Sequence, residues 1–340
     1  MGDEMNAVVT GGGGFLGQRI VARLRHRGDA VTVVSRNRYP AVEAMGATSV
    51  SVDLTEDSEA LVSLMDGVDV VFHVAALAGI WGKRETFFSI NTEGTRRVIE
   101  ACQRAGVPRL VYTGSPSATW SGENEAGCTE AECPYPETFL AHYPASKAAA
   151  EQLVLAANCP EFATTSLRPH LIWGPDDPHL LPRLLARGRQ GRLRIVGEGK
   201  NQVGITFVDN AAHAHILAAD ALAPGSANAG KGYFITDDVP VVLWDWINEV
   251  FSRSGVAPVT KKISAARAEW AGGVLEWIWR MGHLSGEPPM TRFVARQLST
   301  DHHYDLSAAR QDFGYAQLVA DDEAFEKLID WIKAEGLGGA

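Results

Sequence analysis

The spacing of hydrophobic residues changes repeatedly along the first half of the chain, between unbroken apolar runs and the three-to-four-residue repeat of a helix. Asn6–Thr10 and Ala30–Val34 are short apolar runs typical of buried strands, and between them Phe15–Arg27 has the spacing of an amphipathic helix. The pattern continues with strands expected at 49–52, 68–74, 109–112 and 163–167 and helices at 58–65, 85–105 and 143–157. Because alternating strands and helices build parallel sheets with helices on both faces, we predict an α/β fold with a doubly wound parallel sheet.

The pattern changes beyond Trp173. We expect helices at 177–190, 209–222, 241–253 and 264–281, with short strands at 193–196 and 202–207. The helix at 209–222 is expected to return to the first unit. The predicted division is therefore a larger unit of residues 1–170 and 205–235 and a smaller unit of residues 171–204 and 236–340.

Glycines connect the first strand to the first helix. Gly11 would allow a tight turn, Gly14 would let backbone approach a pyrophosphate, and Gly17 would let the helix pack closely on the strand. The N–H groups at the helix start would then face phosphate. This context predicts a dinucleotide-binding Rossmann unit, and we weigh a glycine-rich turn of some other α/β protein as the lesser alternative.

The end of the second predicted strand bears on the choice of cofactor. NAD sites usually carry an acid there for the ribose 2′-hydroxyl, whereas this chain reads Ser35-Arg36-Asn37-Arg38. A guanidinium suits a 2′-phosphate, so we favour NADP(H), with NAD(H) as a possible cofactor. The alternative is a pair of solvated surface arginines.

Tyr143 and Lys147 stand four residues apart at the head of an apolar helical run. This spacing places phenol and ammonium on one helix face. We expect the cation to lower the pKa of Tyr143, so that the phenol can exchange a proton with a carbonyl or alcohol oxygen near neutral pH.

Composition narrows the classes of partner. The 340 residues carry a net charge of −10 without a basic cluster, which argues against nucleic acid. The four cysteines have neither metal nor disulfide-scaffold spacing, so we expect a reducing, cytoplasmic setting and no metal site. Neither a signal peptide nor an apolar stretch long enough to span a membrane is expected.

The motifs together resemble those of the extended short-chain dehydrogenase/reductases, particularly the 3β-hydroxysteroid dehydrogenase-like branch, over essentially the whole chain. They stand in family order at Thr10–Gly17, Asp53-Leu54, Ala75-Ala76, Asn91–Thr95, Tyr143–Lys147, Arg168-Pro169 and Trp173-Gly174-Pro175. The resemblance implies that the larger unit binds NADP and the smaller unit binds substrate. The implied cofactor-binding residues are Gly11, Gly14, Phe15, Leu16, Gly17, Ser35, Arg36, Asp53, Leu54, Ala75, Ala76, Asn91, Tyr143, Lys147 and Pro169.

The same resemblance implies catalytic roles for three residues. Tyr143 would protonate a ketone oxygen, Lys147 would bind the nicotinamide ribose, and Ser115 would hold the oxygen, with Ser117 as an open alternative to Ser115. Sugar-nucleotide dehydratases of the family carry Asp-Glu where this chain has Pro116 and Ser117, so simple redox chemistry is expected.

Longer segments are similar to reductases of bacterial olefin biosynthesis, among them 77–82, 167–175, 190–196 and 286–293. They imply NADPH-dependent reduction of a long-chain 2-alkyl-3-oxoalkanoic acid, a lipid-like substrate, by an expected homodimer. The alternatives are a 3β-hydroxysteroid or sterol-4-carboxylate 3-dehydrogenase, and a non-catalytic NADP-binding sensor or epimerase-like enzyme. Candidate partners for a substrate carboxylate are Lys83-Arg84, Arg183 and Arg292, with none preferred.

Trp270, Val274, Trp277 and Met281 share one helical face. Core packing is the favoured interpretation of such a stripe. The alternative is an apolar wall or lid for a long substrate, or a contact with a membrane surface or a multienzyme assembly. The loop at 120–142 precedes Tyr143 and could fold over the site.

Overall fold

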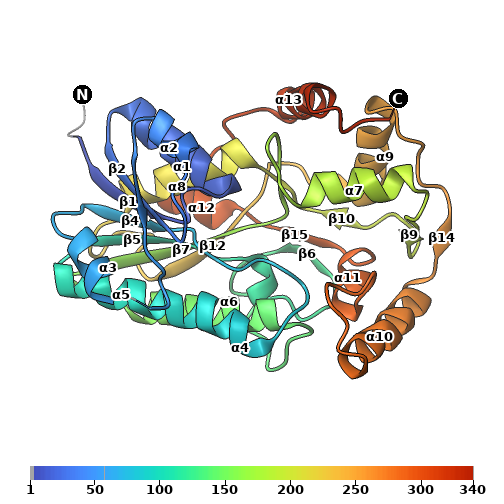
Figure 1. Cartoon of the computed structure of the whole chain (residues 1–340), viewed down its shortest axis with the longest axis horizontal. Helices are drawn as coiled ribbons and strands as arrows, with labels where there is room; N and C mark the ends of the chain where they lie inside the picture. Colours follow the sequence, from blue (N-terminus) through green and yellow to red (C-terminus); the bar gives the residue numbers. More distant parts are fainter. Residues whose placement is uncertain (1–3, 57, 340) are drawn as a thin grey trace.

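The computed structural model describes residues 4–56 and 58–339. Its largest element is a seven-stranded parallel sheet in the order β12-β7-β5-β4-β1-β2-β3 (Figure 1). The strands are β1 (Asn6–Thr10), β2 (Ala30–Ser35), β3 (Thr48–Ser51), β4 (Val70–His73), β5 (Arg109–Thr113), β7 (Ala163–Pro169) and β12 (Lys231–Ile235). The predicted doubly wound parallel sheet is therefore confirmed.

Helices cover both faces of this sheet (Figure 1). On one face lie α1 (Phe15–Arg27), α2 (Pro40–Ala44), α8 (Val208–Ala221) and α12 (Ser307–Phe313), and on the other lie α3 (Ser58–Leu64), α4 (Arg84–Phe87), α5 (Gly94–Ala105) and α6 (His142–Ala156). Each face has its own core of Val, Leu, Ile and Ala side chains. Because α8 packs on α1, the helix expected to return to the first unit does so.

A second region is built mostly from residues after β7 and contains a four-stranded sheet, β13-β10-β15-β6, in which β6 comes from before β7 in the chain. Its strands are β6 (Glu125–Cys128), β10 (Gln202–Val203), β13 (Val241–Val242) and β15 (His302–Tyr304), with two further pairs, β8 (Ile172–Trp173) with β11 (Thr206–Phe207) and β9 (Ile195–Val196) with β14 (Lys262–Ile263). The helices α7 (Leu180–Arg189), α9 (Leu243–Arg253) and α13 (Asp321–Ala334) close a third core around Trp173.

Several predicted elements differ from the observed ones. The helix expected at 85–105 is interrupted by a π-helical segment, Phe88–Glu93, which turns Asn91 inward. The strand expected at 202–207 divides at Gly204 between two sheets, where a Cβ would come within 2.7 Å of Thr236 Cγ2. Within the loop expected at 120–142, β6 (Glu125–Cys128) pairs with β15 in the second sheet.

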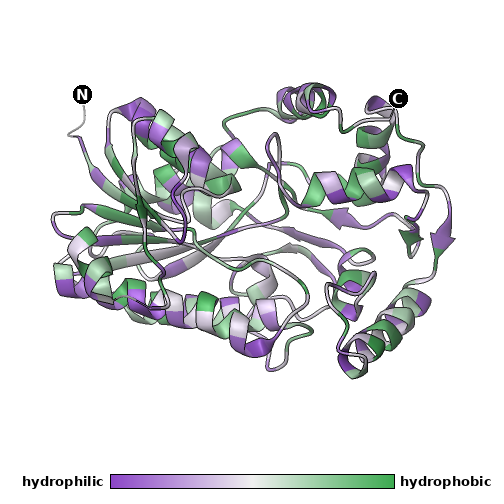
Figure 2. Ribbon diagram, viewed as in Figure 1, coloured by the Kyte–Doolittle hydropathy of each residue, from purple (hydrophilic) through white to green (hydrophobic). Residues whose placement is uncertain are grey.

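The hairpin of α10 (Ala265–Met281) and α11 (Arg292–Gln297) lies at the outer edge of the second region (Figure 1). Core packing is the wrong interpretation of its apolar stripe, because Trp270, Val274, Trp277 and Met281 are all exposed. Figure 2 shows hydrophobic residues along this helix. The periodicity identified one apolar face correctly, but periodicity carries no information on whether another element covers that face. Among the described residues, no helix is long and apolar enough to cross a membrane.

Candidate active site

The turn after β1 brings backbone close to backbone. Gly11 has φ +70°, and a Cβ on it would come within 2.7 Å of the Ala75 backbone. A Cβ on Gly17 would lie 2.3 Å from the Gly11 carbonyl oxygen. These approaches explain why the turn and the helix start require glycine. The turn lies beside the carboxyl end of β4, where the sheet order reverses between β4, β1 and β2.

A phosphate cradle fits at the start of α1. Gly14 is the N-cap residue and is extended, with no side chain over the helix end. Among the described atoms, a Cβ there would meet only the Gly11 carbonyl oxygen within 4 Å, at 3.3 Å. The backbone N–H groups of Phe15 and Leu16 lie in the first turn, where an α-helix supplies no acceptors of its own. The geometry fits the pyrophosphate of a dinucleotide.

The end of β2 offers groups for the nucleotide ribose. The Ser35 hydroxyl is buried and has no hydrogen-bond partner within the described chain, and the Arg36 side chain is exposed beside it. Asp53 Oδ1 accepts hydrogen bonds from the Thr55 N–H and hydroxyl at 2.8 and 2.7 Å. These bonds lower the pKa of Asp53, and the Arg36 charge lowers it further. The neighbouring Leu54 packs near Gly94.

Asn91 holds the segment after β4 in place. Its amide oxygen accepts from the Leu77 N–H at 2.7 Å, and its amide nitrogen donates to the Leu77 carbonyl and the Ser146 hydroxyl. Ala75 is half-buried and Ala76 is exposed at the start of this segment. Asn91 therefore ties the segment to α6, one turn from Tyr143.

Ser115 and Tyr143 meet at the carboxyl edge of the sheet. Burial raises the pKa of Tyr143, and the Ser115 hydroxyl lies close enough to lower it in part. The Ser117 hydroxyl is 2.8 Å from that of Ser115 and is buried behind it. The Phe87 ring packs edge-on against Tyr143. Pro169 ends β7 on the same side of the sheet and is buried.

Lys147 is 2% exposed and donates a 2.6 Å hydrogen bond from Nζ to the Thr113 carbonyl. Its ammonium also lies over the Tyr112 ring. Burial lowers the pKa of Lys147 to about 7, although the Glu151 charge opposes that shift. The expected lowering of the Tyr143 pKa by Lys147 is wrong for this structure, because desolvation of the phenol dominates and Lys147 Nζ is bonded to Thr113.

Sequence reasoning missed the buried partners behind these residues. Glu151 lies one turn after Lys147 and forms a 2.5 Å ion pair with Arg168, both buried. Tyr135 and Ser166 also donate to Glu151. The Arg168-Pro169 motif was a signal for this network, and the spacing of Glu151 four residues after Lys147 was another.

His73 connects β1 to α5, the helix that follows the π-helical segment with Asn91. Its Nδ1 lies 2.6 Å from the Thr10 hydroxyl and its Nε2 lies 2.8 Å from the Thr95 hydroxyl. Burial and the Lys147 charge lower the pKa of His73 to about 3, so the ring is neutral. The neutral imidazole thus links Thr10, which precedes the glycine turn, to Thr95 of α5 through hydrogen bonds between uncharged groups.

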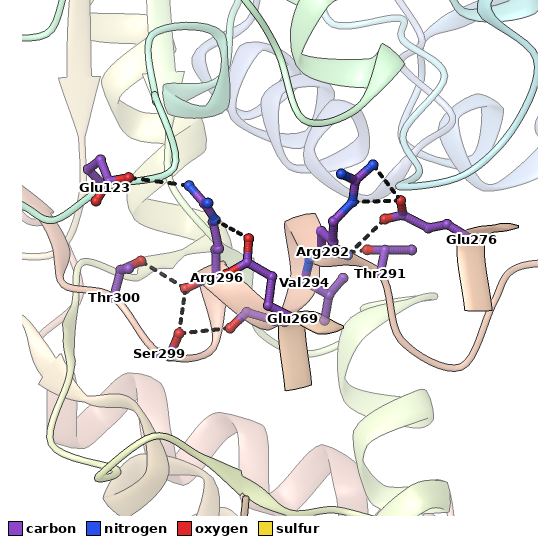
Figure 3. Close-up of polar contacts among 10 residues, drawn as sticks. Glu123, Glu269, Glu276, Thr291, Arg292, Val294, Arg296, Ser299 and Thr300 are labelled. Carbon is purple, nitrogen blue, oxygen red and sulfur yellow. Dashed lines mark hydrogen bonds and ion pairs between the residues drawn. The ribbon is translucent and has the colours of Figure 1, made fainter. Parts of the chain in front are cut away.

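Two of the candidate carboxylate partners are paired with glutamates. Arg183 binds Glu287 at 2.9 Å, and Arg292 binds Glu276 at 2.9 Å (Figure 3). Lys83 and Arg84 are exposed at the start of α4, where the Arg84 guanidinium covers the Phe88 ring. No cluster of His, Cys, Asp or Glu within residues 4–56 and 58–339 could hold a metal ion.

A family model for the 3-beta hydroxysteroid dehydrogenase/isomerase family matches residues 8–264. The chain belongs to this family. It is an NAD(P)-dependent oxidoreductase with the fold and motifs that the sequence predicted. The matched residues include the glycine turn, Ser115, Tyr143 and Lys147.

Relatives cover nearly the whole chain. A 2-alkyl-3-oxoalkanoate reductase from Stenotrophomonas maltophilia is 47% identical over 325 residues, which is 95% of this chain and 98% of the relative. The human sterol-4-alpha-carboxylate 3-dehydrogenase, decarboxylating, is 34% identical over 94% of this chain and 86% of its own. Among solved structures, MoeE5 in complex with UDP-glucuronic acid and NAD is 26% identical, with a TM-score of 0.73 over 97% of this chain and 99% of that one.

Proposed function

We propose that this protein reduces the 3-ketone of a long-chain 2-alkyl-3-oxoalkanoic acid to the 2-alkyl-3-hydroxy acid. The observation that carries the proposal is the 47% identity to a 2-alkyl-3-oxoalkanoate reductase over almost the full length of both chains. The convergence of Ser115, Tyr143 and Lys147 at one sheet edge supports it, because these groups suit proton transfer to a ketone oxygen.

Three side chains divide the work at the ketone. The Ser115 hydroxyl donates to the ketone oxygen and stabilises the negative charge that develops there. Tyr143 delivers the proton to the same oxygen. A nicotinamide cofactor, when bound, supplies the hydride for the ketone carbon. Lys147 binds the cofactor ribose, and its pKa of about 7 lets the side chain gain or lose a proton near neutral pH.

The nucleotide is proposed to lie over the glycine turn, with residues 1–170 and 205–235 as the NADP-binding unit and residues 171–204 and 236–340 as the substrate-binding unit. Two elements cross this division, since β6 joins the second sheet and α12 packs on α8 and β12. Arg36 would pair with the 2′-phosphate and the unpartnered Ser35 hydroxyl would donate beside it. NADPH is therefore the proposed reductant, and NADH a poorer one.

The substrate is proposed to reach Tyr143 past the segment Leu77–Gly82. Trp81 of this segment is half-buried, and a Cβ on Gly82 would lie 3.1 Å from the ring of Phe87, which is buried against Tyr143. Lys83 and Arg84 follow immediately and are exposed, which makes them the proposed partners of the substrate carboxylate.

The test is an assay of the purified chain with NADPH against 2-alkyl-3-oxoalkanoic acids, and of the reverse oxidation of 2-alkyl-3-hydroxy acids with NADP⁺. We expect turnover of both, abolished by Tyr143→Phe. Faster oxidation of a sterol 4-carboxylate than of any 2-alkyl-3-hydroxy acid would overturn the substrate assignment. NADP binding without turnover of either class would indicate a sensor.

A further inference from the structure

Helix α10 packs with its polar side inward. Glu276 is buried, and both of its carboxylate oxygens accept hydrogen bonds from Arg292 of α11. The backbone nitrogen of Arg292 lies 2.8 Å from Oε1, and its Nε lies 2.9 Å from Oε2. Glu269 binds Arg296 at 2.9 Å (Figure 3). A Cβ on Gly272 would lie 2.6 Å from the Thr291 carbonyl carbon. The two helices therefore approach closely through glutamates and glycine.

The apolar side of the same helix faces solvent. Trp270 is 72% exposed, Trp277 is 64% exposed and Met281 is 66% exposed, with Val274 and Ile278 beside them. A shallow groove of about 580 Å³ runs along Trp270, Val274 and Trp277, and Glu269 and Arg292 also line it. None of these side chains belongs to the hydrophobic cores. A helix that pairs its glutamates with a neighbouring helix and exposes its tryptophans presents an apolar surface that suits a contact outside the described chain.

Charge on this face favours a lipid surface. Both glutamates of the helix are neutralised by arginines of α11. The side chains on the outer face include Arg267, and Arg280 lies toward the other end, both exposed. Tryptophan with flanking arginine is the composition of helices that lie in a membrane interface. Glu269 lines the groove beside Trp270, but its ion pair with Arg296 offsets its charge, so the face does not share the net charge of −10 of the whole chain.

The size of the face argues against a second copy of the chain as the occupant. A helix of 17 residues is about 25 Å long, so a face about 10 Å wide offers roughly 250 Å². A stable protein interface needs about 800 Å² on each partner. A lipid surface needs no complementary partner, because an interfacial helix sinks its apolar side about 5–10 Å into the headgroup boundary.

The C-terminal end of α10 lies beside the route to Tyr143. The Arg280 guanidinium lies 5.5 Å from the centre of the Trp81 ring. Burial lowers the pKa of His142, the residue before Tyr143, and the nearby Arg280 charge lowers it further. A Cβ on Gly79 would lie 3.8 Å from Glu287 of the loop that follows α10. The exposed face and the segment Leu77–Gly82 therefore meet at one end of the helix.

We propose that the face of α10 formed by Trp270, Val274, Trp277, Ile278 and Met281 docks on a lipid bilayer surface and opens the site toward it. Docking would let an apolar acyl chain pass from the bilayer to Tyr143 without crossing water. This delivery role rests on the proposed function, whereas the docking itself does not.

The experiment measures co-sedimentation of the full chain with phosphatidylcholine vesicles, alone and with phosphatidylglycerol. The wild type is expected to sediment with both. The double variant Trp270→Ser/Trp277→Ser should lower the partition coefficient at least about tenfold, because binding scales with buried apolar area. The matched control is Val239→Ser/Leu318→Ser, which removes two exposed apolar side chains outside α10 and should bind as the wild type does. Thermal unfolding confirms that all three proteins are folded.

The outcomes separate docking from activity. Turnover of a short, water-soluble 2-alkyl-3-oxo acid should be unchanged in the double variant, and turnover of a long-chain substrate held in vesicles should fall. A wild type that turns over substrate but stays in the supernatant overturns the docking proposal. A wild type that sediments but reduces no 2-alkyl-3-oxo acid overturns only the proposed function.

A second variant tests the charged ends of the face. Arg267→Glu/Arg280→Glu should weaken binding more to vesicles that contain phosphatidylglycerol than to phosphatidylcholine alone. Equal binding of this variant and the wild type to both vesicles contradicts the charge argument. If the tryptophan variant instead converts a dimer to a monomer in light scattering, and neither form binds lipid, a second copy covers the face.

Discussion

Charged side chains usually lie on the surface of a protein and large apolar ones in its interior, and helices α6 and α10 depart from this rule in opposite ways. Helix α6 buries Lys147 and Glu151, and α10 exposes Trp270 and Trp277. The buried charges of α6 have partners that converge on one sheet edge, namely Thr113 and Arg168. The exposed tryptophans of α10 have no covering element in the described chain. The buried charges of α6 therefore indicate a site for chemistry, because their partners lie together at one edge of the sheet. The uncovered apolar face of α10 instead indicates a contact with something outside the described chain.

The largest expected effect is a loss of kcat on changing Tyr143, which lies on α6. Tyr143→Phe should lower kcat at least about a thousandfold, because the ring packs unchanged and only the proton donor is lost. Cofactor binding, measured by fluorescence titration, should stay within about twofold of the wild type. Substantial remaining turnover would mean that another group protonates the substrate and that α6 does not carry the chemistry.

The second effect separates exposed from buried tryptophan. Trp244 in α9 is 2% exposed, so Trp244→Ala should lower the free energy of unfolding by about 3–5 kcal/mol. Trp270→Ala should change it by less than about 0.5 kcal/mol. Urea unfolding of both variants gives the comparison. Equal losses would show that the face of α10 is covered in solution.

The third effect assigns the hydroxyl beside Tyr143. Ser115→Ala should lower kcat about a hundredfold, as for the loss of one donor to a developing oxyanion. Ser117→Ala should cost less, because Ser117 lies behind Ser115 and contacts it at 2.8 Å. Steady-state kinetics on both variants decides between them. A larger loss at Ser117 reverses the assignment.

A smaller effect concerns the nucleotide. The double change Ser35→Asp/Arg36→Ala should weaken NADPH about tenfold and favour NADH, since a carboxylate repels the 2′-phosphate and accepts from a ribose hydroxyl. Isothermal titration with both nucleotides measures the change. If the wild type already binds NADH more tightly, Arg36 is only a solvated surface residue.

The last effect is a dependence on pH. The folded Lys147 has a pKa of about 7 against 10.5 ordinarily. Between these values the unfolded chain binds the extra proton, so the stability of the wild type should rise with pH above 7. Lys147→Met lacks this group, and the difference in Tm between wild type and variant should shift in favour of the wild type from pH 7 to pH 9. A constant difference would indicate an unshifted lysine.

Much of the catalytic edge could be predicted because its signals are local. The bounds of β1 and α1 were predicted as observed, since a strand, a glycine turn and a helix each have their own pattern over a few residues. Tyr143 and Lys147 lie on one helix for the same reason. The pKa of Tyr143 was mispredicted because desolvation depends on neighbours that are distant in sequence.

The outward face of α10 was beyond prediction for a related reason. The spacing of its tryptophans is the same whether another element covers them or not. Ion pairs hold the polar side of α10 against α11. They join Glu276 to Arg292 and Glu269 to Arg296, which are 16 and 27 residues apart in the sequence. Such pairings come from tertiary structure, as does the division of the 202–207 run between two sheets.

The most direct test of the account is a series of kcat/KM values with NADPH for 2-alkyl-3-oxoalkanoic acids of increasing chain length. Each buried CH₂ contributes about 0.8 kcal/mol, so kcat/KM should rise several-fold for each added pair of methylenes until the site is full. A flat profile, or faster reaction with a UDP-sugar than with any lipid ketone, would contradict the account.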